Sequence, residues 1–382
     1  MQEQIRRDVM NISSGEGEKL TDKKVRDLMA DKRRLVEVPY TASLAHTMNA
    51  LVANNVVAVP VAAPPGHWIG AGGSMILESD KQTGVVRKHY IGMATMLDIL
   101  VHIAGDDHMP GGGGGGVSDL DKKMSVPVSS IIGHCLEGLS LWTLSPSTSI
   151  LDCMEVFSKG IHRALVPVDG QMDNVSGPEL MESASSYRML TQMDLVKFLK
   201  DHASDHPLKG ILSRSVRDLG AANENVFAIG SRTRVIDAIR CMREGLLNAV
   251  PIVLGSDSLE EESKNLINGK GKKLIGTFSA TDLRGCHLSA LETWLPLSAL
   301  EFTEAVSSFP LFADVPAGTP NTSSRELVTC YLESPLGEVL DKAVTKHVHR
   351  IWVVDHQGFL VGLVSLTDMI RVLRDFMSDP HL

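Results

Sequence analysis

Four apolar runs end in a hydroxyl residue that is followed by an aspartate three positions later, and each copy lies about ninety residues from the next. Each copy is expected to be a short β-strand that leads into a helix, with the hydroxyl residue as the cap and the aspartate in the first turn. At such a helix start the carboxylate can accept hydrogen bonds from sugar hydroxyls. The hydroxyl group and the backbone N–H groups can donate to phosphate. The four pairs are Thr95 with Asp98, Thr191 with Asp194, Ser279 with Asp282, and Ser365 with Asp368.

A single copy of this pattern is typical of an ordinary capping box, which only stabilises a helix end. Four copies at one period favour a repeated ligand-binding unit instead. Three copies also have a glycine early in the run (Gly92, Gly276 and Gly362), where a strand is approached closely by a neighbour. The second copy has Arg188 there, which either fills its own pocket or adds a phosphate contact.

A histidine–arginine pair stands at the start of a buried strand in the second and fourth repeats. An arginine can bind phosphate with a two-pronged fork, and a charge-assisted hydrogen bond contributes about 1.5 to 3 kcal/mol. A solvated turn with two incidental polar residues is the alternative for a single copy. Residues 55–57 and 246–248 take this place in the first and third repeats and contain no base, so we expect four unequal sites. The two pairs are His162 with Arg163 and His349 with Arg350.

The repeated motif resembles the nucleotide-binding signature of the CBS (cystathionine β-synthase) domain family. The resemblance implies an α/β (α+β) fold of four β-α-β-β-α repeats, paired into two Bateman modules that form a flat disc. It also implies roles for the residues that match the motif. Ribose would be held by Asp98, Asp194, Asp282 and Asp368; Thr95, Thr191, Ser279 and Ser365 would lie near ribose or phosphate; His162, Arg163, His349 and Arg350 would contact phosphate.

The repeats divide the chain into seven expected segments. Residues 1–20 form a polar leader, 21–105 the first repeat, 106–124 a glycine-rich linker and 125–205 the second repeat. The third repeat covers 211–291, a connector 292–324 and the fourth repeat 325–378. Apolar spacing in the connector at 294–306 predicts an amphipathic stretch that packs within the chain rather than against a partner.

Hydrophobic periodicity predicts further elements within the repeats. Strands are expected at 34–38, 56–61, 139–144, 163–168 and 249–254. Helices are expected at 43–53, at 149–158 and around Val235, Ile239 and Met242.

Composition bounds the function. A net charge of −9 disfavours broad binding to nucleic acid or to an anionic membrane. The five cysteines show no CxxC pairing and indicate reduced thiols, and no apolar run is long enough to cross a bilayer. His202 and His206 make only a weak metal candidate, and no catalytic motif is found, so we expect a protein without enzymatic activity, cofactor or metal.

Four CBS repeats that fill nearly the whole chain resemble the γ subunits of AMP-activated and sucrose-non-fermenting-type protein kinases, in particular the plant type. The resemblance implies a regulatory subunit that binds AMP, ADP or ATP and assembles with a kinase α subunit and a β scaffold. A homodimer is a further candidate assembly. The cytoplasm is the expected location, with the nucleus as an alternative. Two other functions stay open: a stand-alone sensor of adenosyl nucleotides, and an interaction scaffold whose motifs only cap helices.

Overall fold

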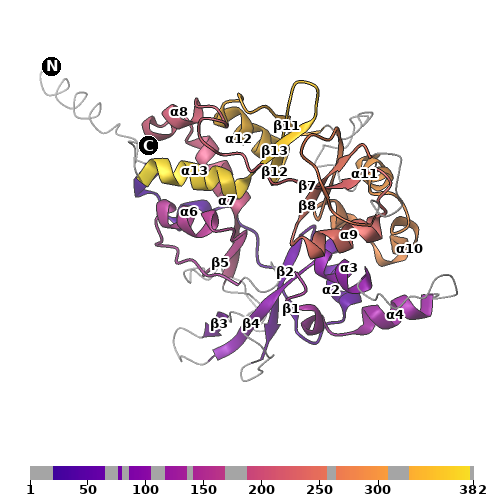
Figure 1. Cartoon of the computed structure of the whole chain (residues 1–382). Helices are drawn as coiled ribbons and strands as arrows, with labels where there is room; N and C mark the ends of the chain where they lie inside the picture. The colour runs from indigo at the N-terminus through magenta and orange to yellow at the C-terminus, as the bar shows by residue number, and fades with distance from the viewer. Residues whose placement is uncertain are drawn as a thin grey trace, which may run out of the picture.

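The computed structural model describes residues 20–64, 76–79, 86–104, 117–135, 141–167, 187–255, 264–308 and 327–378. Figure 1 shows four small α/β units arranged around a common centre. The glycine-rich loop at 70–73 and the glycine run at 111–116 lie outside the described residues.

The first repeat contains β1 (Val38–Pro39), α2 (Leu44–Ala53), β2 (Ala58–Ala63), β3 (Ile76–Ser79), β4 (Val86–Thr95) and α3 (Met96–Ala104). Its sheet has the order β1-β2-β4-β3, with β1 parallel and β4 antiparallel to β2. The expected helix at 43–53 is confirmed, and Ser43 caps it by accepting from the His46 N–H at 3.1 Å. The strand expected at 34–38 was wrong, because the ladder begins only at Val38 and ends at Pro39, which has no N–H to donate.

The second repeat contains α6 (Ile150–Ser158), β5 (Arg163–Pro167), β6 (Tyr187–Thr191) and α7 (Gln192–Asp201), and β5 and β6 are antiparallel. The expected helix at 149–158 is confirmed, with Ser149 as its cap. The strand expected at 139–144 is wrong for its described part, where Thr143 makes only an isolated bridge to Leu165. Helices α4 (Val117–Ser125) and α8 (His206–Leu212) flank this repeat along the chain.

The third repeat contains β7 (Phe227–Gly230), α9 (Val235–Glu244), β8 (Ala249–Val253), β9 (Ile267–Asn268) and β10 (Leu274–Ser279). The α-helix expected after its motif was wrong, because only a 3-10 turn, η5 (Asp282–Gly285), forms there. Ser279 Oγ accepts from the Thr281 N–H at 3.3 Å, and Thr281 becomes the cap of the turn. Gly285 follows at once, and glycine disfavours a helix by about 1 kcal/mol relative to alanine.

The fourth repeat contains β11 (Thr329–Cys330), α12 (Leu336–Thr345), β12 (Arg350–Val354), β13 (Leu360–Ser365) and α13 (Leu366–Ser378). β12 lies in the middle of the sheet, parallel to β11 and antiparallel to β13. This is the most regular copy of the β-α-β-β-α unit.

The first segment of the third repeat packs on the fourth repeat, and the segment at 20–28 of the first repeat packs on the second. The turns η1 (Leu20–Asp22) and η2 (Val25–Leu28) pack on the second repeat, where the Val25 N–H donates to the Thr148 carbonyl at 2.9 Å. In the same way the Val216 N–H donates to the Ser334 carbonyl of the fourth repeat at 3.0 Å. These hydrogen bonds connect the first repeat to the second and the third repeat to the fourth, as expected for two modules.

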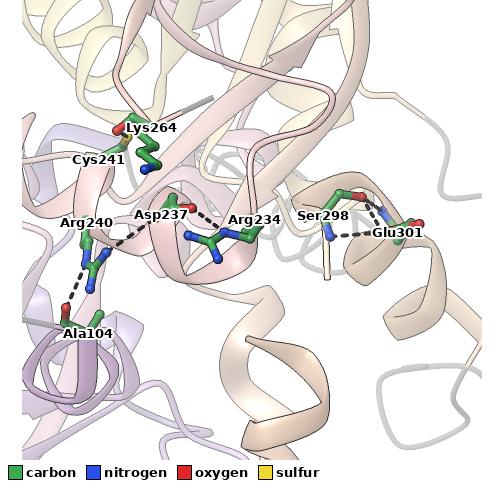
Figure 2. A network of polar contacts seen from close by, with 8 residues as sticks. All are labelled: Ala104, Arg234, Asp237, Arg240, Cys241, Lys264, Ser298 and Glu301. Atoms are coloured by element: carbon green, nitrogen blue, oxygen red, sulfur yellow. Dashed lines mark hydrogen bonds and ion pairs between the residues drawn. The ribbon is translucent and has the colours of Figure 1, made fainter. Parts of the chain in front are cut away.

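Among the described residues, four hydrophobic clusters join neighbouring repeats. One cluster joins the helices of repeats one and three, and a second joins those of repeats two and four. Two smaller clusters join the sheets of repeats three and four and of repeats one and two. Figure 2 shows a polar link across the first contact, where Arg240 of α9 donates to the Ala104 carbonyl at the end of α3 at 2.8 Å.

The described part of the connector, residues 292–308, packs within the chain, which confirms the interpretation from its apolar spacing. It forms α10 (Leu291–Trp294) and α11 (Ala299–Ser308). Phe302 is 1% exposed, and its ring lies 5.9 Å from that of Phe278 in β10. The Ser298 N–H and hydroxyl both donate to Glu301, which caps the start of α11 (Figure 2).

We expect Gly362→Ala to lower the free energy of unfolding by about 1 to 3 kcal/mol, as in other cases of overpacking. A Cβ atom at this position of β13 would lie 2.8 Å from the backbone oxygen of Asn223, which is itself fixed by two hydrogen bonds to Leu363. Gly210→Ala in α8 is the matched control, because a Cβ there meets nothing within 4 Å and helix propensity predicts a small gain. Urea unfolding of both variants measures the difference, and equal stability would contradict the close approach.

Candidate functional site

A cavity of about 700 Å³ lies where the four repeats meet, and all four contribute to its lining. The predicted hydroxyl and basic side chains come together here although they are spread over some 270 residues of sequence. The predicted residues that line the cavity are Thr95, Thr191, Ser279, Ser365, His162, Arg163, His349 and Arg350.

The strand register explains why each hydroxyl lies beside a basic position. The motif residue at the end of one strand pairs with the first residue of the antiparallel strand, as in Arg163 with Thr191 and Arg350 with Ser365. In the first and third repeats the same partner is an alanine, Ala58 or Ala249. The positions that match the histidine–arginine pairs are therefore 57–58 and 248–249, which corrects the alignment at 55–57 and 246–248. Neither corrected pair contains a base.

The four aspartates take part in helix caps. Asp194 Oδ2 accepts from the Thr191 N–H at 2.8 Å and from its hydroxyl at 2.7 Å, and Asp368 Oδ2 accepts from the Ser365 N–H at 3.0 Å. The third motif keeps only part of the pattern, with the Ser279 N–H donating to Asp282 at 2.8 Å. Within the described residues, none of the four aspartates is part of the cavity lining, so their ribose role stays a prediction.

Accessibility separates the even repeats from the odd ones. Asp98 is 0% and Asp282 3% exposed, whereas the side chains of Asp194 and Asp368 are 27% and 20% exposed. Asp194 forms an ion pair with Lys32, and Asp368 Oδ1 lies 3.9 Å from Arg371 Nη2. The accessible carboxylates thus belong to the repeats that also carry the basic pairs.

Asp98 is held on both carboxylate oxygens. Oδ2 accepts from the Thr95 N–H at 2.8 Å and from its hydroxyl at 2.5 Å, while Oδ1 accepts from the Cys135 N–H at 3.0 Å. Burial raises the pKa of Asp98 to about 6, although these hydrogen bonds act in the opposite direction. This carboxylate fastens the segment around residue 135 to the start of α3.

Polar contacts cross between repeats at the cavity. Arg350 Nη1 of the fourth repeat donates to the Ala249 carbonyl of the third repeat at 2.8 Å. The Trp352 indole N–H donates to Thr277 Oγ1 at 2.7 Å across the same boundary. Gln192 Nε2 of the second repeat donates to Thr367 Oγ1 of the fourth at 2.9 Å. A ligand that displaces these side chains would change contacts between repeats.

Sequence reasoning missed several polar residues of the lining, among them Arg284, His347 and Glu304. His347 follows α12 in the left-handed region with a φ of 50°, at the position held by Asn55, Gly160 and Leu246 in the other repeats. Its spacing of two residues before His349 was visible in the sequence. Arg284 stands two residues after a motif aspartate, where the other three motifs have an apolar residue.

The weak metal candidate of His202 and His206 lies partly outside the described residues, because the side chain of His206 is not among them. His202 Nδ1 lies 2.8 Å from the Phe198 carbonyl, and among the described residues no group of three metal-binding side chains is found. All five cysteines are free and buried, and burial raises the pKa of the Cys330 thiol to about 12. In the described part of the chain, no helix combines the length and the apolar character needed to cross a membrane.

Fold and cavity together define a ring of four CBS-type repeats around a basic centre, and a family model described as CBS domain matches residues 322–375. The chain is 61% identical over 356 residues to the SNF1-related protein kinase regulatory subunit gamma-like PV42a of Arabidopsis thaliana, covering 92% of this chain and 95% of the relative. It is 58% identical to PV42b of the same plant, with 92% and 94% covered. The chain therefore belongs to the family of SNF1-related protein kinase regulatory γ-like subunits.

The solved structure of protein MJ1225 from Methanocaldococcus jannaschii, described as an archaeal homologue of γ-AMPK, has the same fold. The TM-score is 0.56 at 16% sequence identity, with 91% of this chain and 99% of that chain covered. The likeness extends over all four repeats and supports the expected arrangement of two modules.

Proposed function

We propose that this chain is a non-catalytic γ-type regulatory subunit of a SNF1-related, AMP-activated-type serine/threonine protein kinase, and that it binds AMP, ADP or ATP in the central cavity. The observation that carries the proposal is the convergence of eight predicted hydroxyl and basic side chains on one cavity. The names of its relatives, regulatory subunits of SNF1-related kinases, support the assignment to a kinase complex. A catalytic α subunit and a β scaffold are the proposed partners, and the cytoplasm is the proposed location.

The even repeats are the proposed phosphate sites. His162 and Arg163 would bind phosphate at the second motif, and His349 and Arg350 at the fourth, each beside a motif hydroxyl and the start of a helix. The accessible carboxylates of Asp194 and Asp368 are the proposed ribose acceptors. In each, Oδ2 accepts the capping hydrogen bonds, and Oδ1 would accept from the ribose hydroxyls. Asp98 and Asp282, both buried, would serve chiefly as structural caps.

Regulation would follow from the place of the cavity between the two modules. A nucleotide that contacts both modules can favour one of their arrangements, and the ring surface would transmit that change to the kinase. The size of the effect is limited by the difference in affinity between the two arrangements. A nucleotide that binds both arrangements equally would leave kinase activity unchanged.

An interaction scaffold is the second candidate, because the hydrogen bonds of the motif aspartates are those of ordinary helix caps. In that case the repeated motif would only stabilise helix ends. Nucleotide binding separates the two functions, and copurification with kinase subunits separates a kinase regulator from a stand-alone sensor.

Calorimetric titration of the purified chain with AMP, ADP and ATP tests the proposal. We expect micromolar binding, which corresponds to about −8 kcal/mol. Quenching of tryptophan fluorescence should accompany binding, because Trp352 lines the cavity. Absence of binding by all three nucleotides would favour the scaffold, whereas ATP turnover by the pure chain would contradict a non-catalytic role.

A further inference from the structure

The third repeat contributes one arginine to the central cavity from an unusual position. Arg284 stands two residues after the motif aspartate. The matching residues of the other repeats are Leu100, Val196 and Ile370, and each is 0% exposed in the hydrophobic core. An arginine at that position of a regular motif helix would place its charge among apolar side chains, which is strongly unfavourable.

The shortened helix of the third motif removes this conflict. After Ser279 the chain forms the single turn η5 rather than an α-helix, and the Arg284 N–H donates to the Thr281 carbonyl at 3.3 Å. Arg284 is therefore only partly buried and belongs to the cavity lining together with Ser279 and Thr281. The irregular turn and the basic residue occur together in this repeat alone.

We propose that Arg284 is the phosphate contact of the third repeat, and that it makes the cavity select ligands with two or three phosphates over those with one. The inference rests on the proposed function, since it specifies which nucleotides the same cavity prefers. Arg284 would take the place of the base that is missing at Asn248 and Ala249.

Contacts around Ser279 connect Arg284 to the fourth repeat. The Ser279 hydroxyl lies 3.5 Å from the Asn248 carbonyl and 3.0 Å from the Thr281 hydroxyl. Arg350 donates to the carbonyl of the next residue, Ala249, at 2.8 Å. Arg350 thus reaches the residue that pairs with Ser279 in the sheet, and Ser279, Arg284 and Arg350 all line the same cavity. In this proposal a phosphate chain bound first at the fourth motif extends from Arg350 toward Ser279 and Arg284, so a longer chain gains the contact with Arg284.

The charge of the lining supports a polyanionic ligand. Arg163, Arg284 and Arg350 line the cavity with three histidines, and Glu304 of α11 is the single acidic residue among the described residues that line it. Opposite charges attract more strongly in a partly enclosed site than in bulk water. Glu304 opposes phosphate binding, so its neutral replacement should strengthen the preference for longer phosphate chains.

Titration of the full-length chain with AMP, ADP and ATP tests the inference. We expect the wild type to bind ATP about tenfold more tightly than AMP, as one additional charge-assisted contact predicts. Arg284→Gln should remove most of this preference by weakening ATP, with AMP affinity changed by less than about threefold. Arg243→Gln is the matched control, because Arg243 is an exposed arginine of the same repeat outside the central cavity. It should bind all three nucleotides like the wild type.

The outcomes separate the two proposals. If the wild type binds no nucleotide, both the proposed function and the role of Arg284 are wrong. If it binds nucleotides and Arg284→Gln leaves the ratio of ATP to AMP affinity unchanged, only the role of Arg284 is overturned. Glu304→Gln gives an independent reading should Arg284→Gln fail to fold. The ratio should rise with this variant, and an unchanged or lower ratio would also refute the inference.

Discussion

Replacing Asp98 by asparagine is expected to remove a pH dependence of about 3 kcal/mol from the free energy of unfolding. Burial raises the pKa of this carboxyl from 3.8 to about 6, and one pKa unit corresponds to about 1.36 kcal/mol. Because the folded-state pKa is the higher one, the protonated form is favoured by folding. The stability that the protonated Asp98 carboxyl contributes is fully present below about pH 4, and it is lost as the pH rises through about 6.

Urea unfolding at several pH values between 4 and 7 measures this contribution. The difference in stability between the wild type and Asp98→Asn should change by about 3 kcal/mol across the range, with the wild type losing stability relative to the variant as the pH rises. In this difference, the pH-dependent contributions of carboxylates that are present in both proteins cancel. Asp152→Asn is the control, because Asp152 belongs to a similar Ser-x-x-Asp cap at Ser149 but is exposed. Parallel profiles for the wild type and Asp98→Asn would contradict a buried carboxyl.

The repeats were predictable because their signals are local. Caps at Ser43 and Ser149, apolar spacing in the helices and the recurrent motif each involve only a few neighbouring residues. Such signals fix where a helix begins whatever the rest of the chain does. The same locality predicted the hydroxyl and basic residues that the structure brings to one cavity.

The strand alignment was not predictable from hydrophobicity alone. Each second strand follows a residue with positive φ, and only in the second repeat is that residue a glycine, Gly160. Leu246 and His347 adopt the same left-handed conformation, which is unusual for side chains of this size. In the third and fourth repeats there is therefore no local sign of where the turn ends. The register of strand pairs, a long-range property, supplied the correction at 57–58 and 248–249.

The burial of each motif aspartate depends on contacts with residues distant in the sequence. The same holds for the packing of the first segment of one repeat on the neighbouring repeat. The four motifs look equivalent in sequence, yet Asp98 accepts from Cys135 and Asp194 pairs with Lys32. Residues 25–28 and 216–219 share the sequence Val-Arg-Asp-Leu, but the attachment of each segment to the partner repeat rests on hydrogen bonds to Thr148 and Ser334. Local pattern identified these residues, and tertiary packing decided what each of them contacts.

The double variant His349→Ala/Arg350→Ala is expected to weaken ATP binding by about a hundredfold or more. Two charge-assisted contacts to phosphate at about 1.5 to 3 kcal/mol each would be lost, and 1.4 kcal/mol corresponds to a factor of ten. Asn248→Ala is the matched control, because Asn248 occupies in the third repeat the position of His349 and lines the same cavity without a charge. It should change the affinity by less than about threefold. Calorimetric titration of the three proteins gives the comparison.

A structural contribution must be separated from this loss of affinity, because Arg350 also donates to the Ala249 carbonyl across the third and fourth repeats. Truncation leaves that carbonyl without this donor and should lower the melting temperature by a few degrees. Arg350→Lys keeps the charge while losing the two-pronged fork, so it should recover part of the affinity if phosphate is bound there. Equal losses in the double variant and in Asn248→Ala would mean that the cavity responds to any change of its wall. A loss confined to the basic pair would show that the fourth repeat binds the phosphate, as the pairing of Arg350 with Ser365 and the accessible carboxylate of Asp368 predict.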